Sequence, residues 1–584
     1  MIRQPWIQSI RYILMGAAVF VLAPQTWATD YYVDAVQGND AGGGTSVNAP
    51  WKSIAKVNSR SFNPGDQILF KRGGVWKEML VAPSSGSASN PVTLGAYGSG
   101  DKPVITAVDA IPGGKTAGTW TNLSGNVWYM SLAADPLRVF LNGQEYGRAQ
   151  TPSAPNATLR YGYDSAAKRL YLYATANPAS AYATLEHAAA RTHALRTNQK
   201  NYLVIRDLDL RGGGVASLEF AESNFITVDG CDIGWNSGKF GILAHGYGAS
   251  KVSLNGVIRN CLLDSGSRLR SPYHISPEIP HDGIKLRYGC QNWEIHHNTL
   301  RDWGHTGIYV TGDAGYQTKN NKVYSNYLTA PDIDYGRGLS IDGPDGTCFN
   351  NEMFFNSVID TTCRNQINGD HNLFYYNIIA GMTNVAYAAN GTAQGISSEG
   401  YTGWASHHNQ FFNNLILNCD EAGIKVWGFT GATDKYANEY RNNIVYNCGR
   451  NSKDNYKNFG IVIENHTTVK NNIYTNNLVF QPAGITNVVN YRGTAMSVPT
   501  FNSQNGKNGD TAAGNLFGDP LFTDLAGGDY TLQANSPAID AGIPVGLNQG
   551  LGGVSVPYGL TVDIGPYEYV PVPLPPIVER IVPN

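Results

Sequence analysis

The stretch "PHDGIKLRYGCQNWEIHHNTLRDWGHTGIYV" (residues 280–310) contains nearly the same phrase twice, "HDGIKL" and "HTGIYV". The pattern Gly-apolar-x-apolar returns later as "GLSI", "GISS", "GIKV" and "GIVI". An Asn followed by apolar residues also recurs, at Asn260, Asn298, Asn326, Asn356, Asn377, Asn414 and Asn443. Self-similarity at such a period is typical of a solenoid.

The form of the repeat predicts which solenoid it is. The segments are short, alternate like strands and show no helical period, so we predict an all-β fold, a right-handed parallel β-helix, in which each coil adds one strand to each long sheet. The asparagines would form an internal hydrogen-bonded ladder. One inward column would hold Ile284, Ile308, Leu339, Ile367, Ile396, Ile424 and Ile461.

The cysteines follow a similar spacing. They are Cys231, Cys261, Cys290, Cys348, Cys363, Cys419 and Cys448, an odd number without a CxxC pair, which makes a zinc cluster of cysteines improbable. Several intervals are close to the coil length. We expect stacked, buried thiols, with disulfides as the alternative in an exported protein.

The N-terminus predicts export. Arg3 and Arg11 precede the apolar run "YILMGAAVFVLA", and "TWA" follows, so residues 1–28 are expected to be a signal peptide cleaved after Ala28. The run is too short to span a bilayer, and no later run is longer. We therefore expect a secreted or periplasmic protein without a membrane span.

Composition limits the partners and suggests the domain organisation. A net charge of −3 argues against nucleic acid, although a local basic patch could still bind a polyanion, and we expect a monomer. Residues 29–114 would form the N-terminal cap and first coils. Residues 115–190, with short alternating strands and "NG" turns, would be a β-rich insertion that forms one wall of a ligand-binding groove on the β-helix. Residues 191–545 would be the catalytic β-helix, and residues 546–584 a closing segment with a Pro-rich tail.

Two terminal stretches resemble a known superfamily. "YYVDAVQGNDAGGGTSVNAPWKSIAKVNSRSFNPGDQILFKRGGVWKE" near the front, and "GDPLFTDLAGGDYTLQANSPAIDAG" with "DIGPYEY" near the back, are similar to the opening and closing segments of secreted β-helix glycosidases and lyases of the pectin-lyase-like superfamily. The resemblance implies the architecture and a carbohydrate ligand. It leaves the reaction open, because hydrolases, lyases, epimerases and adhesins share this fold.

A second resemblance concerns the order of motifs. "HDG" at 281, "GHTG" at 304, "GRGLSIDG" at 336 and "GIKV" at 423 resemble the succession of motifs in polygalacturonase-like glycoside hydrolases. The paired aspartates of that family are missing here, and its Gly-His-Gly is replaced by Gly336-Arg337-Gly338. Only the sheet and the class of ligand are therefore implied.

The inward column predicts two outward ones. One step on lie Lys285, Tyr309, Ser340, Asn368, Ser397, Lys425 and Val462; three steps on lie Arg287, Thr311, Asp342, Asp370, Glu399, Trp427 and Glu464. Three carboxylates on successive coils, about 4.8 Å apart, would repel and raise at least one pKa. We interpret Asp342, Asp370 and Glu399 as candidate catalytic acids; the alternative is a solvated face whose acids are bridged by bases.

The flanking residues suit a sugar. Trp427 offers a flat apolar surface, and Lys425 and Arg287 can donate hydrogen bonds to hydroxyl or carboxylate groups. His281 and His305 would stack one coil apart, with Asp282 and Arg337 near them. These histidines either cap turns, bind a neighbouring sugar unit, or serve as acid or base, so Asp282 and His305 are further catalytic candidates.

Three functions remain open from the sequence. The leading hypothesis is a secreted glycoside hydrolase that needs no cofactor, with two of the three acids as catalytic pair in either the retaining or the inverting geometry. The second is a polysaccharide lyase or uronate epimerase, in which Lys285, Lys425, Tyr309 or a histidine takes the proton and the acids Asp342, Asp370 and Glu399 hold Ca²⁺. The third is a non-catalytic glycan-binding β-helix.

Overall fold

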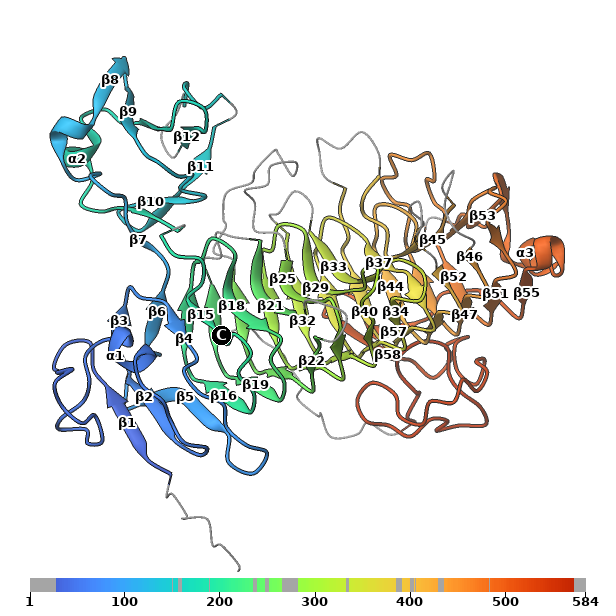
Figure 1. The fold of residues 1–584 in the computed structure, drawn as a ribbon. Helices are drawn as coiled ribbons and strands as arrows, with labels where there is room; N and C mark the ends of the chain where they lie inside the picture. The colour runs from blue at the N-terminus through green and yellow to red at the C-terminus, as the bar shows by residue number, and fades with distance from the viewer. Residues whose placement is uncertain are drawn as a thin grey trace, which may run out of the picture.

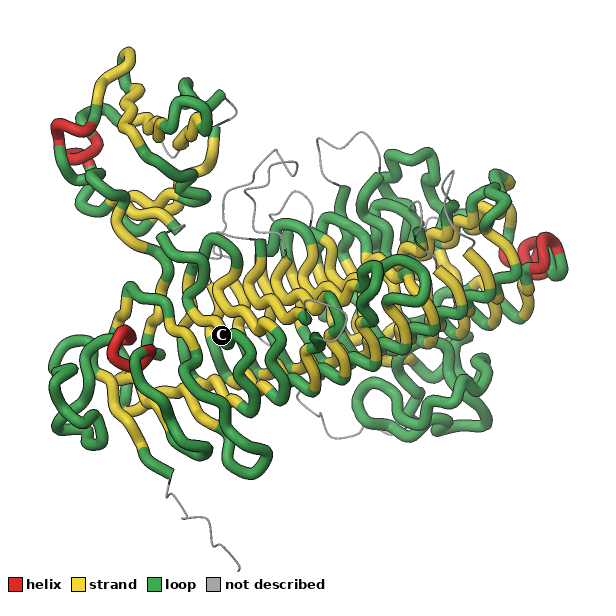
Figure 2. Tube along the Cα trace, in the orientation of Figure 1, coloured by secondary structure: helices red, strands yellow, loops and turns green. Residues whose placement is uncertain are grey.

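The computed structural model describes residues 28–149, 151–155, 160–188, 190–234, 239–246, 251–264, 282–331, 336–384, 391–399, 404, 406–428, 435–482 and 484–571 (Figure 1). Short strands dominate it, and helices are few (Figure 2). They are α1 (Ile54–Asn58), α2 (Pro178–Ala181), α3 (Val498–Asn502) and the 3-10 turns η1 (Ala117–Thr119) and η2 (Lys507–Gly509). No helix in these ranges is long and apolar enough to cross a membrane. Residues 1–27 of the expected signal peptide and residues 572–584 of the tail lie outside them.

The coils build four stacked sheets. Sheet 1 has 14 strands, from β1 (Asp30–Val33) to β55 (Thr511–Ala513), and sheet 2 has 13 strands, from β3 (Val75–Trp76) to β56 (Leu516–Phe517). Neighbouring strands within these sheets come from successive coils and pair in parallel, for example β16 (Leu203–Arg206) with β19 (Ile226–Asp229). The expected parallel β-helix is confirmed.

Sheets 3 and 4 carry the side chains of functional interest. Sheet 3 consists of β4 (Leu80–Val81), β15 (Leu195–Arg196), β18 (Ala216–Ala221), β21 (Phe240–His245), β25 (Asp282–Arg287), β29 (Thr306–Thr311), β33 (Arg337–Asp342), β37 (Asn365–Ile367), β41 (Ile396–Ser398), β45 (Ile424–Val426), β49 (Ile461–Ile463), β53 (Val489–Tyr491) and β54 (Thr494–Met496). Sheet 4 consists of β22 (Ser253–Leu254), β26 (Cys290–Gln291), β30 (Thr318–Lys319), β34 (Cys348–Phe349), β38 (Gly369–Asp370), β42 (Ser406–His407), β46 (Lys435–Tyr436) and β50 (Val469–Lys470).

The predicted inward column is confirmed except at one coil. Ile284 pairs with Ile308, and Ile308 with Leu339, while Ile396 pairs with Ile424 and Ile424 with Ile461. All of these side chains are fully or almost fully buried. At β37, however, Asn365 occupies the position predicted for Ile367, because Asn365 pairs with Ile396 and Ser340 pairs with Gln366.

A ladder of asparagines runs along the turns, as predicted, and it is longer than expected. Each Asn side chain donates from Nδ2 to Oδ1 of the next, in the order Asn298, Asn326, Asn356, Asn377, Asn414, Asn443, Asn477 and Asn515. Asn260 is not part of it; the neighbouring Cys261 takes that place, donating its backbone N–H to Asn298. Each bond satisfies a buried polar group that would otherwise be costly.

The seven cysteines are free and buried, so their predicted burial is confirmed and the alternative disulfides are not formed. The polypeptide between the first coils and β15 forms a separate eight-stranded sheet. Its strands, in spatial order, are β7 (Asp109–Ala110), β14 (Leu185–His187), β10 (Val139–Leu141), β11 (Gln144–Arg148), β12 (Arg160–Asp164), β13 (Arg169–Tyr173), β9 (Val127–Ser131) and β8 (Thr121–Ser124). Figure 1 shows this sheet standing above the first coils.

The closing segment covers sheet 2. The hairpin of β57 (Phe522–Asp524) and β58 (Asp529–Leu532) and the residues after it bring Phe522, Leu532 and Ile564 into one apolar cluster with Leu415 and Ile444. This segment lies beneath the coils in Figure 1. The closing segment therefore occupies the outer face of the later strands of sheet 2.

Candidate functional site

The outer face of sheet 3 carries two columns of polar side chains, one residue position per coil. The first column contains Arg196, Glu219, Leu243, Lys285, Tyr309, Ser340, Gln366, Ser397, Lys425 and Val462. The second contains His245, Arg287, Thr311 and Asp342, and continues with Asn368, Glu399, Trp427 and Glu464, whose backbone N–H groups bond to the coil before.

Asp370 is not in this column, and its predicted place among the acids is wrong. The shifted pairing at β37 puts Asn368 there, and the Asn368 Oδ1 accepts a bond of 3.0 Å from the backbone N–H of Glu399. Gly369 then turns the chain with a φ of +80°, a left-handed conformation that glycine adopts without strain. Asp370 therefore belongs to sheet 4, where it pairs with His407.

Asp342 is a buried acid of the face whose pKa is raised. Its side chain is 1% exposed, it accepts a bond of 2.5 Å from the Tyr309 hydroxyl, and it accepts one of 3.2 Å from Gln366 Nε2. Burial raises the pKa of Asp342 to about 6, although Tyr309 and Arg337 act in the opposite direction. A carboxyl of this kind can deliver a proton near neutral pH.

Asp282, the first residue of β25, forms a second polar centre. It is 1% exposed; Lys285 Nζ lies 3.1 Å from Oδ2, and His305 Nδ1 lies 2.8 Å from Oδ1. Burial alone would raise the pKa of Asp282, but the charge of Lys285 and the bond to His305 hold it well below its usual range. Burial lowers the pKa of His305, so the imidazole is favoured in its neutral form.

Lys285 connects the Asp282 centre with the pair of Tyr309 and Asp342. Its ammonium group lies 4.1 Å from the centroid of the Tyr309 ring, while it also bonds Asp282. Arg337, on β33, is 7% exposed and its positive charge acts on Asp342, Tyr309 and His305 alike. These predicted site residues are thus brought together on three successive strands.

Glu399 is buried in an ion pair. Its carboxylate accepts two bonds from Arg364, of which the one from Nη2 is 2.9 Å long. Glu399 is one position before Trp427 in the second column, and Asn368 separates it from Asp342. The two acids are therefore two coils apart, about 9.6 Å between their backbones.

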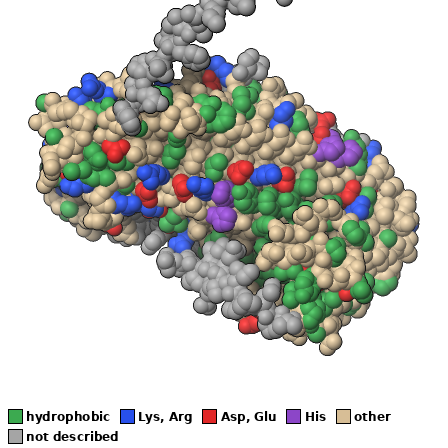
Figure 3. All heavy atoms as spheres, turned by 90° about the horizontal axis from the view of Figure 1, so that it is seen from below, with side chains coloured by type: hydrophobic (Ala, Val, Ile, Leu, Met, Phe, Trp, Pro, Cys, Tyr) green, Lys and Arg blue, Asp and Glu red, His purple; other side chains and the backbone are tan. Residues whose placement is uncertain are grey.

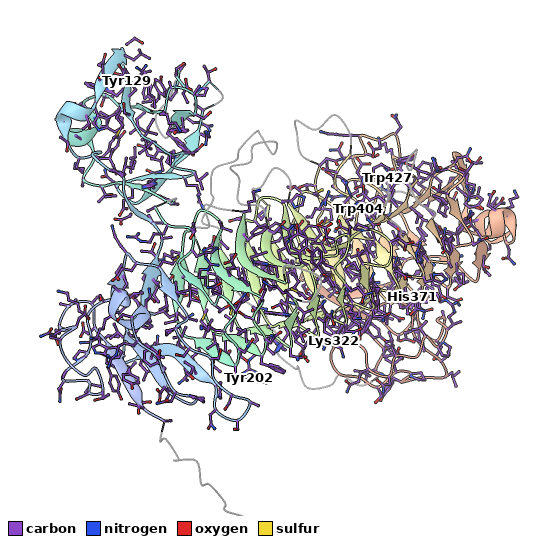
Figure 4. All side chains as sticks on the ribbon, viewed as in Figure 1. Tyr129, Tyr202, Lys322, His371, Trp404 and Trp427 are labelled. Carbon is purple, nitrogen blue, oxygen red and sulfur yellow. The ribbon has the colours of Figure 1, made fainter. Side chains whose placement is uncertain are left out.

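Trp427 and Lys425 form the far end of the face. Trp427 Nε1 donates to Ser397 Oγ over 3.0 Å, and the Lys425 ammonium lies 4.6 Å from the indole centroid. Lys425 is 5% exposed and bonds Asp454 at 3.0 Å, so a sugar would reach it only by displacing this contact. Figure 4 places Trp427 on the upper side of the β-helix, together with Trp404.

The remaining predictions concern Arg287, His281 and a Ca²⁺ site. The Arg287 guanidinium lies over the neighbouring Tyr288 ring, 3.5 Å from its centroid, while its position opposite Thr311 is as predicted. His281 lies outside the described residues, so the expected stack of His281 on His305 is untested. The Ca²⁺ site predicted from Asp342, Asp370 and Glu399 is not assembled, because Asp370 is on another sheet and Glu399 pairs with Arg364.

Sequence reasoning missed a third buried centre on the same face. Glu219 lies 3.2 Å from His245 Nε2, 3.4 Å from His193 Nε2 and 3.4 Å from Arg196 Nε. Burial would raise the pKa of Glu219, but the bonds to His193 and His245 hold it well below its usual range. The strand "ASLEFA" gave a signal, since it carries a carboxylate in the outward column of Lys285.

Comparisons with known proteins support the fold. Residues 188–343 match the family model described as a right handed beta helix region. A lacto-N-biosidase of Bifidobacterium longum is 42% identical over 85 residues, which are 14% of this chain and 5% of that protein. The match therefore spans a small part of the relative's length.

Solved structures align with this chain at lower identity. The lacto-N-biosidase of Eubacterium ramulus aligns with 17% identity and a TM-score of 0.45, over 84% of this chain and 68% of that one. A pectate lyase aligns with 13% identity and a TM-score of 0.38, over 93% of this chain and 97% of that one. The family-model match over residues 188–343 supports the β-helix fold and leaves the reaction open.

Proposed function

We propose that this β-helix is a carbohydrate-active enzyme, specifically a glycoside hydrolase with Asp342 as its general acid. The observation that carries the proposal is the buried Asp342 carboxyl, with a pKa raised to about 6 and a bond from Tyr309 that fixes its orientation. Glycoside hydrolysis needs a carboxylic acid that is still protonated near neutral pH, so that it can protonate the leaving oxygen.

Glu399 is the proposed second carboxylate. Two coils of separation put the backbones of the two acids about 9.6 Å apart, just above the range of about 6.5–9.5 Å that inverting enzymes keep between their carboxyl groups to admit a water molecule. In this arrangement the Glu399 carboxylate accepts a proton from that water, while Arg364 orients it through two hydrogen bonds. Asn368 lies between the two acids, and its buried Nδ2 has no hydrogen-bond partner within the described residues, so it could donate to a sugar hydroxyl.

The other centres would hold the glycan. Lys285 and the neutral His305 present hydrogen-bonding groups at one end of the face, and the Trp427 ring offers an apolar surface at the other. Glu219 with its histidines extends the polar surface by two coils. A site of this length suits an oligosaccharide or polysaccharide, and we place its action in the periplasm or outside the cell.

The lyase or epimerase alternative has less support than the glycoside hydrolase. Its base would be Tyr309, Lys285, Lys425 or a histidine, but burial raises the pKa of Tyr309 well above its ordinary value, which opposes the phenolate. The acids proposed to hold Ca²⁺ are not adjacent. The lacto-N-biosidase relative adds weight to hydrolysis, and a purely glycan-binding role would leave the raised pKa of Asp342 without use.

One experiment separates the three functions. The protein is incubated with a panel of neutral and uronate-containing glycans, and each reaction is followed for new reducing ends and for ultraviolet absorbance of an unsaturated product. We expect reducing ends without absorbance, in the presence or absence of a chelator. Absorbance that a chelator abolishes would establish the lyase instead, and binding without either product would establish the adhesin.

A further inference from the structure

We propose that Asp370, His371, His407 and His408 form a binding site for a divalent transition-metal ion, Zn²⁺ by preference, on sheet 4 and the turn after it, outside the outer face of sheet 3. Seen from below, histidine side chains reach the surface in two groups (Figure 3). Figure 4 places His371 on the lower side and Trp427 on the upper side. The proposal does not depend on the reaction proposed for Asp342.

The four ligand atoms converge. One carboxylate oxygen and three imidazole nitrogens all lie within 4.8 Å of one another, and no other group of three or more potential ligands with this spacing exists in the described ranges. His407 Nδ1 is 2.8 Å from Asp370 Oδ1 and 3.0 Å from His408 Nδ1, and His371 Nδ1 also contacts Asp370 Oδ1. Three nitrogens directed at one oxygen resemble a coordination shell.

A second observation concerns the proton on His407. Its Nε2 lies 2.9 Å from Asp345 Oδ1, and a carboxylate can only accept, so Nε2 carries the hydrogen. In a neutral ring the lone pair is then on Nδ1, directed at Asp370 and His408. Such a contact is repulsive unless a cation lies between the partners, and carboxylate–histidine–zinc relays have this arrangement.

The donor set selects the ion. Three imidazoles and one carboxylate suit tetrahedral Zn²⁺, and related nitrogen-preferring ions such as Co²⁺; Ca²⁺ and Mg²⁺ prefer oxygen ligands. The rings are oriented by stacking, His371 on His408 with centroids 4.7 Å apart and His407 on Tyr436 at 5.0 Å. The cysteines, being buried, do not compete for the ion at the surface.

The position of the site indicates its effect. Asp370 and His371 come from one coil and His407 and His408 from the next, joined where Asp370 pairs with His407. Asp345 lies three residues after Asp342, in the turn that follows β33. A bound ion would therefore hold these two coils together. Through His407 and Asp345 it would also stabilise the turn that follows Asp342, next to β37, where the register of sheet 3 shifts.

The test uses the full chain without a histidine tag, stripped with a chelator and then titrated with zinc chloride in a calorimeter. We expect one equivalent of Zn²⁺ to bind and the melting temperature to rise. Cobalt chloride should produce the visible absorption bands of tetrahedral Co²⁺. Neither readout requires a substrate, so failure of the proposed hydrolase would not affect this result.

The decisive variant is His371→Asn with His408→Asn. Both side chains are well exposed and both residues have a positive φ, which Asn tolerates, so folding should survive. We expect at least about a tenfold loss of Zn²⁺ affinity, and about tenfold for Asp345→Asn, which removes only the partner of His407.

The matched control is His297→Asn. His297 also has a positive φ and its Nδ1 lies 2.8 Å from that of His296, so this pair repeats the local geometry without belonging to the four-ligand group. Zn²⁺ binding should be unchanged. The proposal is overturned if the parent takes up no Zn²⁺, or if the double variant keeps the parent's stoichiometry and affinity.

Discussion

Tyr309 and Asp342 face each other from neighbouring strands of the β-helix, with the phenol hydroxyl donating to the carboxylate over 2.5 Å. The bond orients an acid that burial keeps protonated to an unusually high pH. It also gives the acid a partner that can be removed by deleting a single oxygen atom.

Asp342→Asn should slow catalysis strongly without unfolding the protein. Losing a general acid costs about 10² to 10⁴ in rate, whereas the amide fills the same volume and needs no buried charge. The measurement is kcat on the glycan that the panel identifies. Glu352→Gln is the control, because Glu352 also accepts a bond from a tyrosine, Tyr375 at 2.9 Å, on sheet 1; it should keep the parent's rate.

Tyr309→Phe should shift the pH profile. The Tyr309 bond lowers the pKa of Asp342, so its removal should move the alkaline limb, where the acid loses its proton, from about pH 6 to higher pH. A profile whose limb stays in place in the Phe variant would contradict the assignment of that limb to Asp342.

The same carboxyl should make stability depend on pH. Since the folded state holds the Asp342 proton more tightly than the unfolded state, the stabilisation is complete below the ordinary value of 3.8 and is lost as the pH rises through about 6. Urea denaturation at several pH values measures it. Asp342→Asn should flatten this part of the curve.

Asp282→Asn should act in the opposite sense. The depressed pKa of Asp282 stabilises the fold above its ordinary value, and this contribution disappears as the pH falls. At neutral pH we expect a loss of about 1–3 kcal/mol, because His305 and the nearly buried Lys285 lose their partner. Lys322→Ala, which breaks a longer and more exposed pair with Glu352, should cost under about 0.5 kcal/mol.

The asparagine ladder predicts a contrast between two look-alike residues. Asn377→Ala removes bonds to Asn414, to Asn356 and to the Met353 carbonyl, which leaves buried groups unsatisfied and should cost several kcal/mol by the sum of about 1–3 per group. Asn260→Ala, outside the ladder, loses one exposed bond to Asp229 and puts alanine at a φ of +54°, so it should cost only about 1 kcal/mol. Equal effects at both sites would refute the role assigned to the ladder.

The sequence predicted the coil architecture because its period is repeated many times, so that an error at one coil leaves the others in register. It misplaced Asp370 because Ile367 and Asn365 are two residues apart, and both place a side chain on the inner side. Asn365 occupies the inward column because Gln366 pairs with Ser340 and Ser397. No local sequence pattern predicts this pairing.

The partners of the acids were harder to predict than the acids. Arg364 reaches Glu399 from the adjacent coil, 35 residues away, and His193 and His245 reach Glu219 from coils on both sides. Such contacts depend on the exact stacking of coils. The grouping of Asp282, Lys285, His305, Tyr309 and Arg337 was predictable because all of them lie on strands whose register the repeat determines.

The antiparallel pairing of β53 with β54 bears on how long such a molecule can grow. A stack of parallel strands ends in a row of unpaired N–H and C=O groups, which would accept the first coil of another copy and polymerise end to end. Reversing the last strand breaks the direction that a new coil would have to continue, and α3 packs beside β55 and β56 at the same end. Deleting β54 should therefore turn a discrete particle into one that forms filaments, visible by electron microscopy.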